Sequence, residues 1–125
     1  MSPLPSMEER RFSRRFRVTD KAAFVSSANW PGKGTLVDIS DGGFAFHYQS
    51  STPWPSERNE LCQVIGLHES FIDNLPVWMV ADQVVSLGGG NTLVVRRRSL
   101  KFGPLTSNQQ FLLECFIWIN SMSHC

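Results

Sequence analysis

Apolar and polar residues alternate along several short stretches of this chain, and turn-forming residues separate those stretches. Alternation of this kind is typical of half-buried β-strands. The run Gly88-Gly89-Gly90-Asn91 between two long stretches predicts a hairpin, and 50–59, with two prolines, predicts a loop. The pattern therefore indicates a mainly β protein, a small antiparallel barrel or sandwich. The predicted strands are 22–30, 35–40, 44–48, 61–67, 77–87 and 92–102.

One helix is predicted near the end of the chain, over 107–120. Ser107 and Gln110 have the spacing of a capping box, in which the two side chains satisfy each other's backbone amides. From Phe111 to Ile119 the apolar residues are so dense that more than one face of the helix must be covered. Two interpretations remain open. The helix packs only on the β-structure, or it also binds a partner protein or a second copy of the chain.

The 125 residues, 42% hydrophobic and 18% charged, are expected to form one globular domain. We expect tails at 1–7 and 121–125 and a domain over 8–120, made of an arm (8–18), a β-barrel (21–102) and the helix. No secretory signal pattern opens the chain, and no stretch has the roughly 18 apolar residues of a membrane span. The sequence therefore predicts a cytoplasmic protein without membrane insertion.

The formal net charge of +1 conceals an uneven distribution of arginine. Five of the nine arginines lie between Arg10 and Arg17, and three more are consecutive at 96–98. A protein that binds DNA or RNA would be expected to carry a large basic face, so neither is the expected partner. Local basic clusters suit a small anion better. The run 96–98 is either a solvated strand face or the source of one stacking contact with a ligand.

Two short motifs carry the candidate chemistry: Arg10-Arg11-Phe12-Ser13-Arg14-Arg15, followed by Asp38-Ile39-Ser40-Asp41-Gly42-Gly43. Arginine forks can donate two hydrogen bonds to the O6/N7 edge of guanine or to phosphate oxygens. A carboxylate such as that of Asp38 can accept from the N1–H and N2–H donors of guanine. The alternative for Asp38 and Ser40 is that they merely cap a turn. Together the motifs suit a guanine base that carries phosphate.

No catalytic or metal-binding pattern accompanies these motifs. Ser40 has no recognisable His–Asp partnership, and the glycine run at 88–90 precedes a strand, so it is not a dinucleotide fingerprint. The cysteines lack CxxC spacing and the histidines lack HxxxH spacing, so ordinary thiols and histidines are expected. The four tryptophans are expected to serve packing. The protein is therefore predicted not to be an enzyme, and neither a metal nor a cofactor is expected.

In order and spacing, the RxxxR and DxSxxG motifs resemble the PilZ domain family, and the resemblance extends from Glu9 to about Asn120. It implies a six-stranded antiparallel β-barrel with a C-terminal α-helix, and a site for the bacterial second messenger cyclic di-GMP. The register Arg11/Arg15 is preferred because the family often shows an RRxxxR form, and Arg10/Arg14 stays open. The residues implied to bind the nucleotide are Arg10, Arg11, Arg15, Asp38, Ser40 and Gly43.

The resemblance also implies how such a protein would work. Cyclic di-GMP would order the arm 8–18 against the barrel, and a downstream protein, not identified by the sequence, would recognise the ordered state. The alternative is an adaptor of the same fold that acts by protein contacts without nucleotide. A small RNA-binding barrel is disfavoured by the low net charge. A monomer or weak dimer is expected, and the output (motility, exopolysaccharide or attachment) stays open.

Overall fold

The computed structural model describes residues 16–18, 23–87 and 94–121. Within them the chain forms seven strands, a short 3-10 turn and one α-helix, and every strand pair is antiparallel. The elements are β1 (Phe16–Arg17), β2 (Phe24–Ser27), β3 (Gly34–Ile39), β4 (Gly43–Gln49), β5 (Glu60–Ile65), η1 (Leu67–Glu69), β6 (Phe71–Leu87), β7 (Val94–Phe102) and α2 (Ser107–Ser121).

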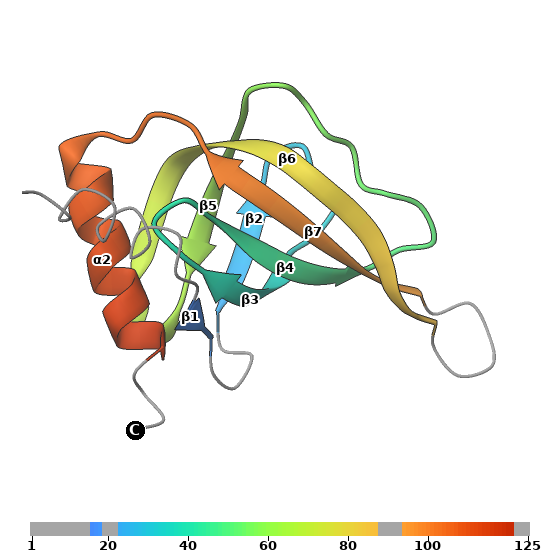
Figure 1. Ribbon diagram of the computed structural model, residues 1–125, viewed down its shortest axis with the longest axis horizontal. Coiled ribbons are helices and arrows are strands. Elements are labelled where there is room, and N and C mark those ends of the chain that lie inside the picture. The colour runs from blue at the N-terminus through green and yellow to red at the C-terminus, as the bar shows by residue number, and fades with distance from the viewer. Residues whose placement is uncertain (1–15, 19–22, 88–93, 122–125) are drawn as a thin grey trace, which may run out of the picture.

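Six of these strands close into a barrel in the order β3-β2-β5-β6-β7-β4, because β4 pairs back onto β3 (Figure 1). The predicted fold class, a six-stranded antiparallel barrel with a C-terminal helix, is confirmed. β6 begins at Phe71, six residues before the predicted start of that strand. Proline inside a strand removes a hydrogen-bond donor and normally argues against the assignment, which is why Pro76 concealed this part. The carbonyl of Pro76 still accepts from the amide of Gly103 (2.8 Å).

β1 and β2 lie one after the other along the same edge of β3, and β4 occupies its other edge. Phe16 pairs with Ile39, whereas Phe24 pairs with Thr35 at the opposite end of β3. Between these pairs the amide of Val18 donates to the carbonyl of Val37 at 3.0 Å. The short strand β1 thus attaches the N-terminal part of the chain to the end of β3 that carries Asp38.

The core follows from the two-residue alternation of the strands. On β4, Phe44, Phe46 and Tyr48 point into the barrel and are buried, while His47 lies on the outer face. Phe46 packs against Trp54 and Trp30, which close the barrel at the end away from the helix. Burial of these large rings stabilises the barrel, at about 25 cal/mol per Å² of apolar surface.

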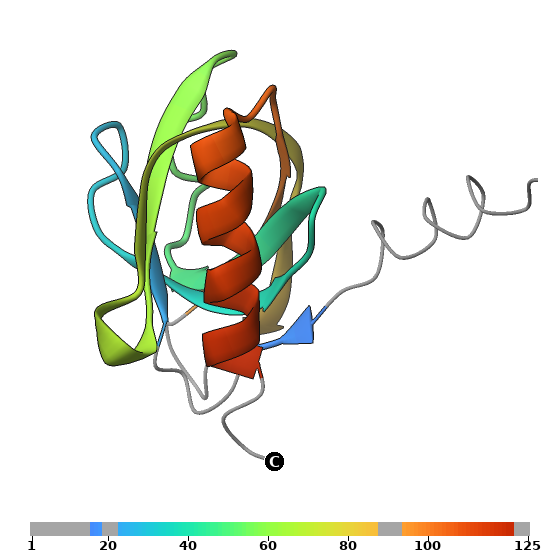
Figure 2. The same ribbon diagram turned by 90° about the vertical axis from the view of Figure 1, so that its left-hand side faces the viewer.

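α2 covers the other end of the barrel (Figure 2). Its inner face buries Leu113, Phe116 and Ile117, and its outer face leaves Phe111 and Trp118 62% and 67% exposed. The helix therefore packs on the barrel with one face and carries apolar side chains on the other as well, as the dense apolar pattern required. The expectation that all four tryptophans serve packing is wrong for Trp118 and for Trp78, which is 45% exposed.

α2 begins at Ser107, as predicted, but its capping box lies one residue earlier than predicted. The hydroxyl of Thr106 accepts from the amide of Gln109 (3.0 Å), and the side chain of Gln109 accepts from the amide of Thr106 (3.0 Å). This is a reciprocal capping box, but it uses Thr106 and Gln109 instead of Ser107 and Gln110. Neighbouring Thr-Ser and Gln-Gln pairs make the two registers indistinguishable in the sequence.

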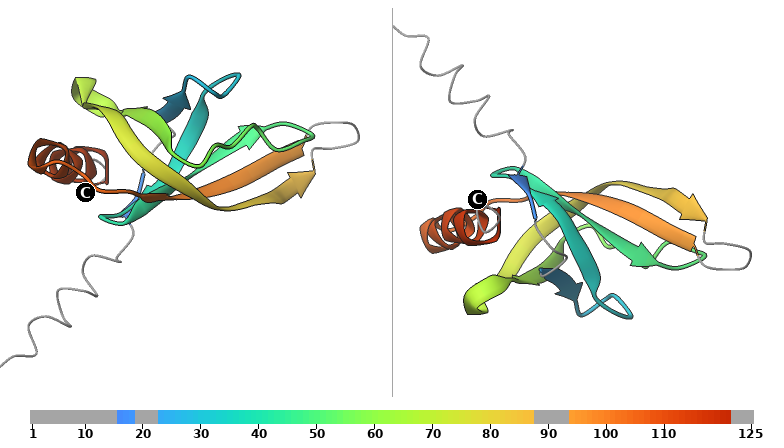
Figure 3. Two further views of the ribbon diagram at one scale, coloured as in Figure 1. Left: turned by 90° about the horizontal axis from the view of Figure 1, so that it is seen from above. Right: turned by 90° about the horizontal axis from the view of Figure 1, so that it is seen from below.

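The long hairpin of β6 and β7 projects beyond the barrel at the end opposite α2 (Figures 1 and 3). There β6 pairs with β7 alone among the described residues, because its pairing with β5 ends at Val77. Val80, Val84 and Leu87 are exposed along this stretch. Register shifts on β6 between Met79 and Ala81 and between Val84 and Ser86 mark two β-bulges in the hairpin.

Candidate ligand-binding site

The turn between β3 and β4 is built around the buried hydroxyl of Ser40. Its Oγ accepts from the amide of Gly42 (3.1 Å) and donates to the carbonyl of Gly43 (3.3 Å), and the backbone amide of Ser40 donates to that same carbonyl (2.8 Å). Ser40 is only 3% exposed. In the described structure its hydroxyl therefore shapes the turn, the structural role that the sequence left open for it.

Gly43 lies where β4 closely approaches the backbone of β7. A Cβ atom at this position would be 2.0 Å from the carbonyl oxygen of Leu100, a distance that no real side chain allows. By contrast, a Cβ at the neighbouring Gly42 would meet only the hydroxyl of Ser40 at 3.9 Å. Packing of β4 on β7 thus requires glycine at 43, whether or not a ligand also uses the space.

A β-bulge turns Asp38 to the outside of the barrel. Leu36 pairs with Phe46 and Asp38 pairs with Ala45, so Val37 is an extra residue in the ladder. In a regular strand, with Val37 paired in the ladder, Leu36 and Asp38 would share the buried face, because side chains two residues apart point the same way. Bulges are common where a side chain must be re-aimed beside a functional site. The carboxylate of Asp38 consequently lies on the outer face, with its side chain 17% exposed.

The outward carboxylate of Asp38 forms an ion pair with Arg97 of β7. The distance from Arg97 Nη2 to Asp38 Oδ2 is 3.0 Å, and the arginine side chain is 33% exposed. β4 lies between the two strands, so the guanidinium reaches across the outer face of β4, where Ala45 presents only a methyl group. The contact between Arg97 and Asp38 was not predicted from the sequence.

Arg96 and Arg98 point to the opposite face and meet Asp82 of β6. Arg96 Nε lies 2.7 Å from one carboxylate oxygen, and Arg98 Nε lies 2.8 Å from the other. Arg98 also donates to the carbonyls of Trp54 (2.6 Å) and Pro55 (3.1 Å), and its side chain is fully buried. The interpretation of 96–98 as a solvated face is therefore wrong for Arg98, which holds the 50–59 loop onto the barrel.

The first motif lies outside the described residues, so the structure does not locate Arg10, Arg11 or Arg15. Its point of attachment is described, however. Phe16, the residue that follows Arg15, pairs with Ile39, and Arg17 pairs with Asp38. The chain that carries the arginines therefore joins the barrel beside the turn that carries Asp38, Ser40 and Gly43.

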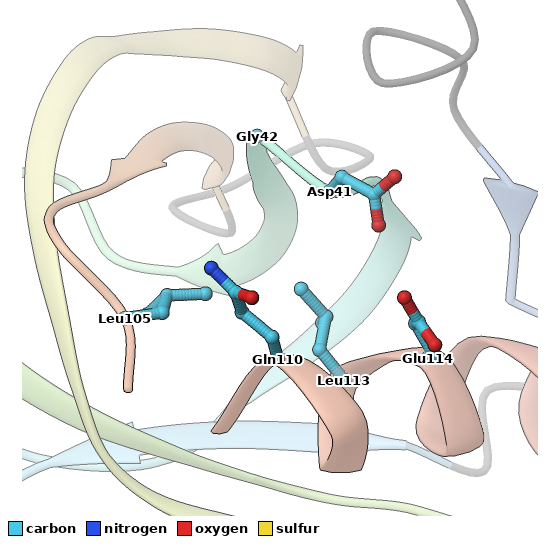
Figure 4. Close-up of a pocket in the computed structure, with 6 residues that line it drawn as sticks. All are labelled: Asp41, Gly42, Leu105, Gln110, Leu113 and Glu114. Carbon is cyan, nitrogen blue, oxygen red and sulfur yellow. The ribbon is translucent and has the colours of Figure 1, made fainter. Parts of the chain in front are cut away.

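A pocket of about 390 Å³ lies between this turn and α2, lined by Asp41, Gly42, Leu105, Gln110, Leu113 and Glu114 (Figure 4). The carboxylates of Asp41 and Glu114 both face it. Partial burial, and secondarily the charge of Glu114, raise the pKa of Asp41 above its ordinary value. Two carboxylates repel phosphate, so this pocket does not suit the anionic part of a nucleotide.

The described residues contain no group of three or more His, Cys, Asp or Glu side chains that could hold a metal ion. No helix in the described part of the chain is long and apolar enough to cross a membrane.

Neither a protein-family model nor a curated protein matches the chain. Solved structures do resemble it. The K. pneumonia MrkH–c-di-GMP complex matches with a TM-score of 0.64 and 18% identity, over 83% of this chain and 49% of that one. MrkH in its apo state gives 0.66 and 17%, over 89% and 49%. The Borreliella burgdorferi PlzA protein in complex with c-di-GMP gives 0.60 and 12%, over 93% and 55%.

These likenesses show the fold. The barrel with its C-terminal helix recurs in two proteins whose structures were solved with c-di-GMP bound. The chain spans about half the length of the solved chains it matches. The sequence identities are all below 20%. The ligand of those proteins is therefore known for them, and for this chain it is a proposal.

Proposed function

We propose that this protein is a non-enzymatic receptor for cyclic di-GMP that binds the nucleotide with Arg10, Arg11 and Arg15 from the N-terminal arm and with the Asp38–Gly43 turn. The observation that carries the proposal is the pairing of β1 with β3. Phe16, the residue that follows the first motif in the sequence, lies opposite Ile39, so that motif joins the described chain at the end of β3 that carries Asp38. The similar folds of MrkH and PlzA, both solved with c-di-GMP, support the choice of ligand.

The chemistry of the two motifs is complementary to this ligand. Arginine forks would bind the phosphates and the O6/N7 edges of the guanines, and would stack on the bases. Asp38 would accept from the N1–H and N2–H groups of one guanine, since its carboxylate lies on the outer face. Ser40 would act on the ligand chiefly by fixing the turn that positions Asp38.

In the proposed mechanism, ligand phosphates neutralise the arm arginines and draw the arm toward the turn, and a downstream protein recognises that ordered surface. An adaptor that acts by protein contacts alone is the second candidate. It is favoured by the outer face of α2, where Phe111 and Trp118 are mostly exposed, because exposed apolar patches mark interaction sites. Nucleotide binding by the purified protein decides between the two.

Isothermal titration of the protein with cyclic di-GMP, with GTP and cyclic di-AMP as control ligands, tests the proposal. Loss of one bidentate arginine contact costs about 1–3 kcal/mol, or roughly 5- to 150-fold in affinity. We therefore expect Arg11→Ala and Arg15→Ala each to weaken binding by that factor, with unfolding temperatures unchanged. Asp38→Ala should also weaken it. No heat of binding with the wild-type protein would refute the receptor and leave the adaptor.

A further inference from the structure

We propose that Arg97 is a positioning residue for the Asp38 carboxylate, and that it sets the selectivity of the site for guanine. The inference rests on the proposed function, because it concerns how the same site recognises the base. It does not follow from either motif, since Arg97 lies on β7, 59 residues after Asp38 in the sequence. It follows from the ion pair across β4.

The geometry of that ion pair constrains the carboxylate. Arg97 Nη2 lies 3.0 Å from Asp38 Oδ2, and both side chains are mostly shielded, with 33% and 17% of their surface exposed. A guanidinium is planar and donates in fixed directions, so a contact of this kind orients the acceptor as well as attracting it. Each carboxylate oxygen has two lone pairs, so Oδ2 can accept from Arg97 and from a ligand at once.

Orientation is what base recognition needs at this position. The N1–H and N2–H donors of guanine lie side by side in the plane of the ring, and both reach a carboxylate only when it is held close to that plane. Binding groups must generally sit within about 10–20° of the productive geometry. A rotating Asp38 would still bind one donor but would lose the second contact for much of the time.

Arg96 and Arg98, the two arginines that flank Arg97, do not orient Asp38. Arg96 and Arg98 lie on the opposite face, where Asp82 binds both of them. On β4, Ala45 is fully buried between Asp38 and β7, and its short side chain leaves room for the guanidinium to cross. Arg97, on the outer face, reaches Asp38.

The test removes one group from the protein and one from the ligand. The affinity of wild type and Arg97→Ala is measured by titration for cyclic di-GMP and for its inosine analogue, which keeps N1–H but lacks the N2 amine. Arg58→Ala is the matched control, because it removes the same charge from an exposed loop. Arg97→Lys, which keeps the charge but not the planar fork, is the second variant, and thermal unfolding shows that each variant folds.

We expect Arg97→Ala to weaken cyclic di-GMP binding by about tenfold, the effect of one hydrogen bond to a charged group. In Arg97→Ala the affinity for cyclic di-GMP, divided by that for the inosine analogue, should fall toward one. In Arg97→Lys this ratio should lie between the values of Arg97→Ala and wild type. Arg58→Ala should leave the ratio unchanged. An equal loss for both ligands would overturn the inference, because Arg97 would then act only on phosphate. Tighter binding would overturn it too, since Arg97 would then mask Asp38. Failure of the wild-type protein to bind either ligand would instead refute the proposed function.

Discussion

Replacing Asp82 with alanine should remove a large part of the stability of this fold. Asp82 is the shared partner of Arg96 and Arg98, and it also accepts a hydrogen bond from the hydroxyl of Tyr48. The side chain of Asp82 is 5% exposed, and those of the two arginines are 11% and 0% exposed. Its removal leaves a buried guanidinium without a counter-charge, which costs about 3–5 kcal/mol in comparable pairs.

The expected change in melting temperature follows from chain length. An unfolding entropy of about 2.1 cal/mol/K per residue gives roughly 0.26 kcal/mol/K for this chain. A loss of about 3–5 kcal/mol therefore corresponds to a melting temperature lower by roughly 11–19 °C. Domains are stable by only about 5–15 kcal/mol, so urea unfolding at 25 °C should detect the same loss without relying on heat.

Asp82→Asn and Glu57→Ala complete this experiment. Asparagine keeps the shape and one acceptor oxygen of Asp82, so its effect should be smaller than that of alanine. Glu57 is exposed in the loop that Arg98 holds, and its loss should change stability by less than about 0.5 kcal/mol. If Asp82→Ala has the same melting temperature as Glu57→Ala, the carbonyls of Trp54 and Pro55 alone satisfy Arg98. That result would refute the reasoning.

The hydrogen bonds of Asp82 also predict that the stability of the protein depends on pH. Burial alone would raise the pKa of Asp82, but hydrogen bonds from Tyr48, Arg96 and Arg98 outweigh it and hold the pKa below its ordinary value. A carboxyl with a lowered pKa in the folded state stabilises the protein above its unfolded pKa of about 3.9. That contribution is lost as the pH falls through the folded pKa. The gap in unfolding free energy between wild type and Asp82→Ala should therefore shrink below about pH 4.

Two other features give predictions that can be checked directly. Gly43→Ala should destabilise the protein by about 1–3 kcal/mol in denaturant unfolding, because β4 must move away from the Leu100 carbonyl. Gly42→Ala is its control and should be nearly neutral; equal effects would show that the close approach does not matter. On addition of cyclic di-GMP, hydrogen exchange should slow in 8–18 and in the 38–43 turn, and in α2 only if the helix relays the signal. An arm that is equally protected with and without ligand would contradict the proposed ordering.

Much of the fold could be predicted because its strands alternate cleanly. Phe44, Phe46 and Tyr48 at every second position of β4 leave little choice of face, and the glycine-rich run 88–91 separates two long strands. The first six residues of β6 were missed because Pro76 is a poor strand residue on any local scale. Its place in the barrel comes from pairing with β5, which is a tertiary effect.

Only the part of the candidate site that is local in the sequence could be predicted. Asp38, Ser40 and Gly43 lie on one turn because they are close in the sequence, so their motif was enough to group them. The contact between Asp38 and Arg97 depends on strand order, on register and on the bulge at Val37. None of these has a local signature. Alternation alone would have placed Arg97 on the face opposite Arg96 and Arg98, but not beside Asp38.

The attachment of β1 to β3 also determines an effective concentration. Phe16 is fixed opposite Ile39, so the motif that ends at Arg15 is tethered within a few residues of Asp38. A nucleotide held by the turn would meet the arginines in an intramolecular step, at the millimolar concentrations typical of short tethers. Affinity would then depend on the attachment of Phe16 to β3 as much as on the contacts themselves. A two-residue strand could thus contribute to binding without touching the ligand.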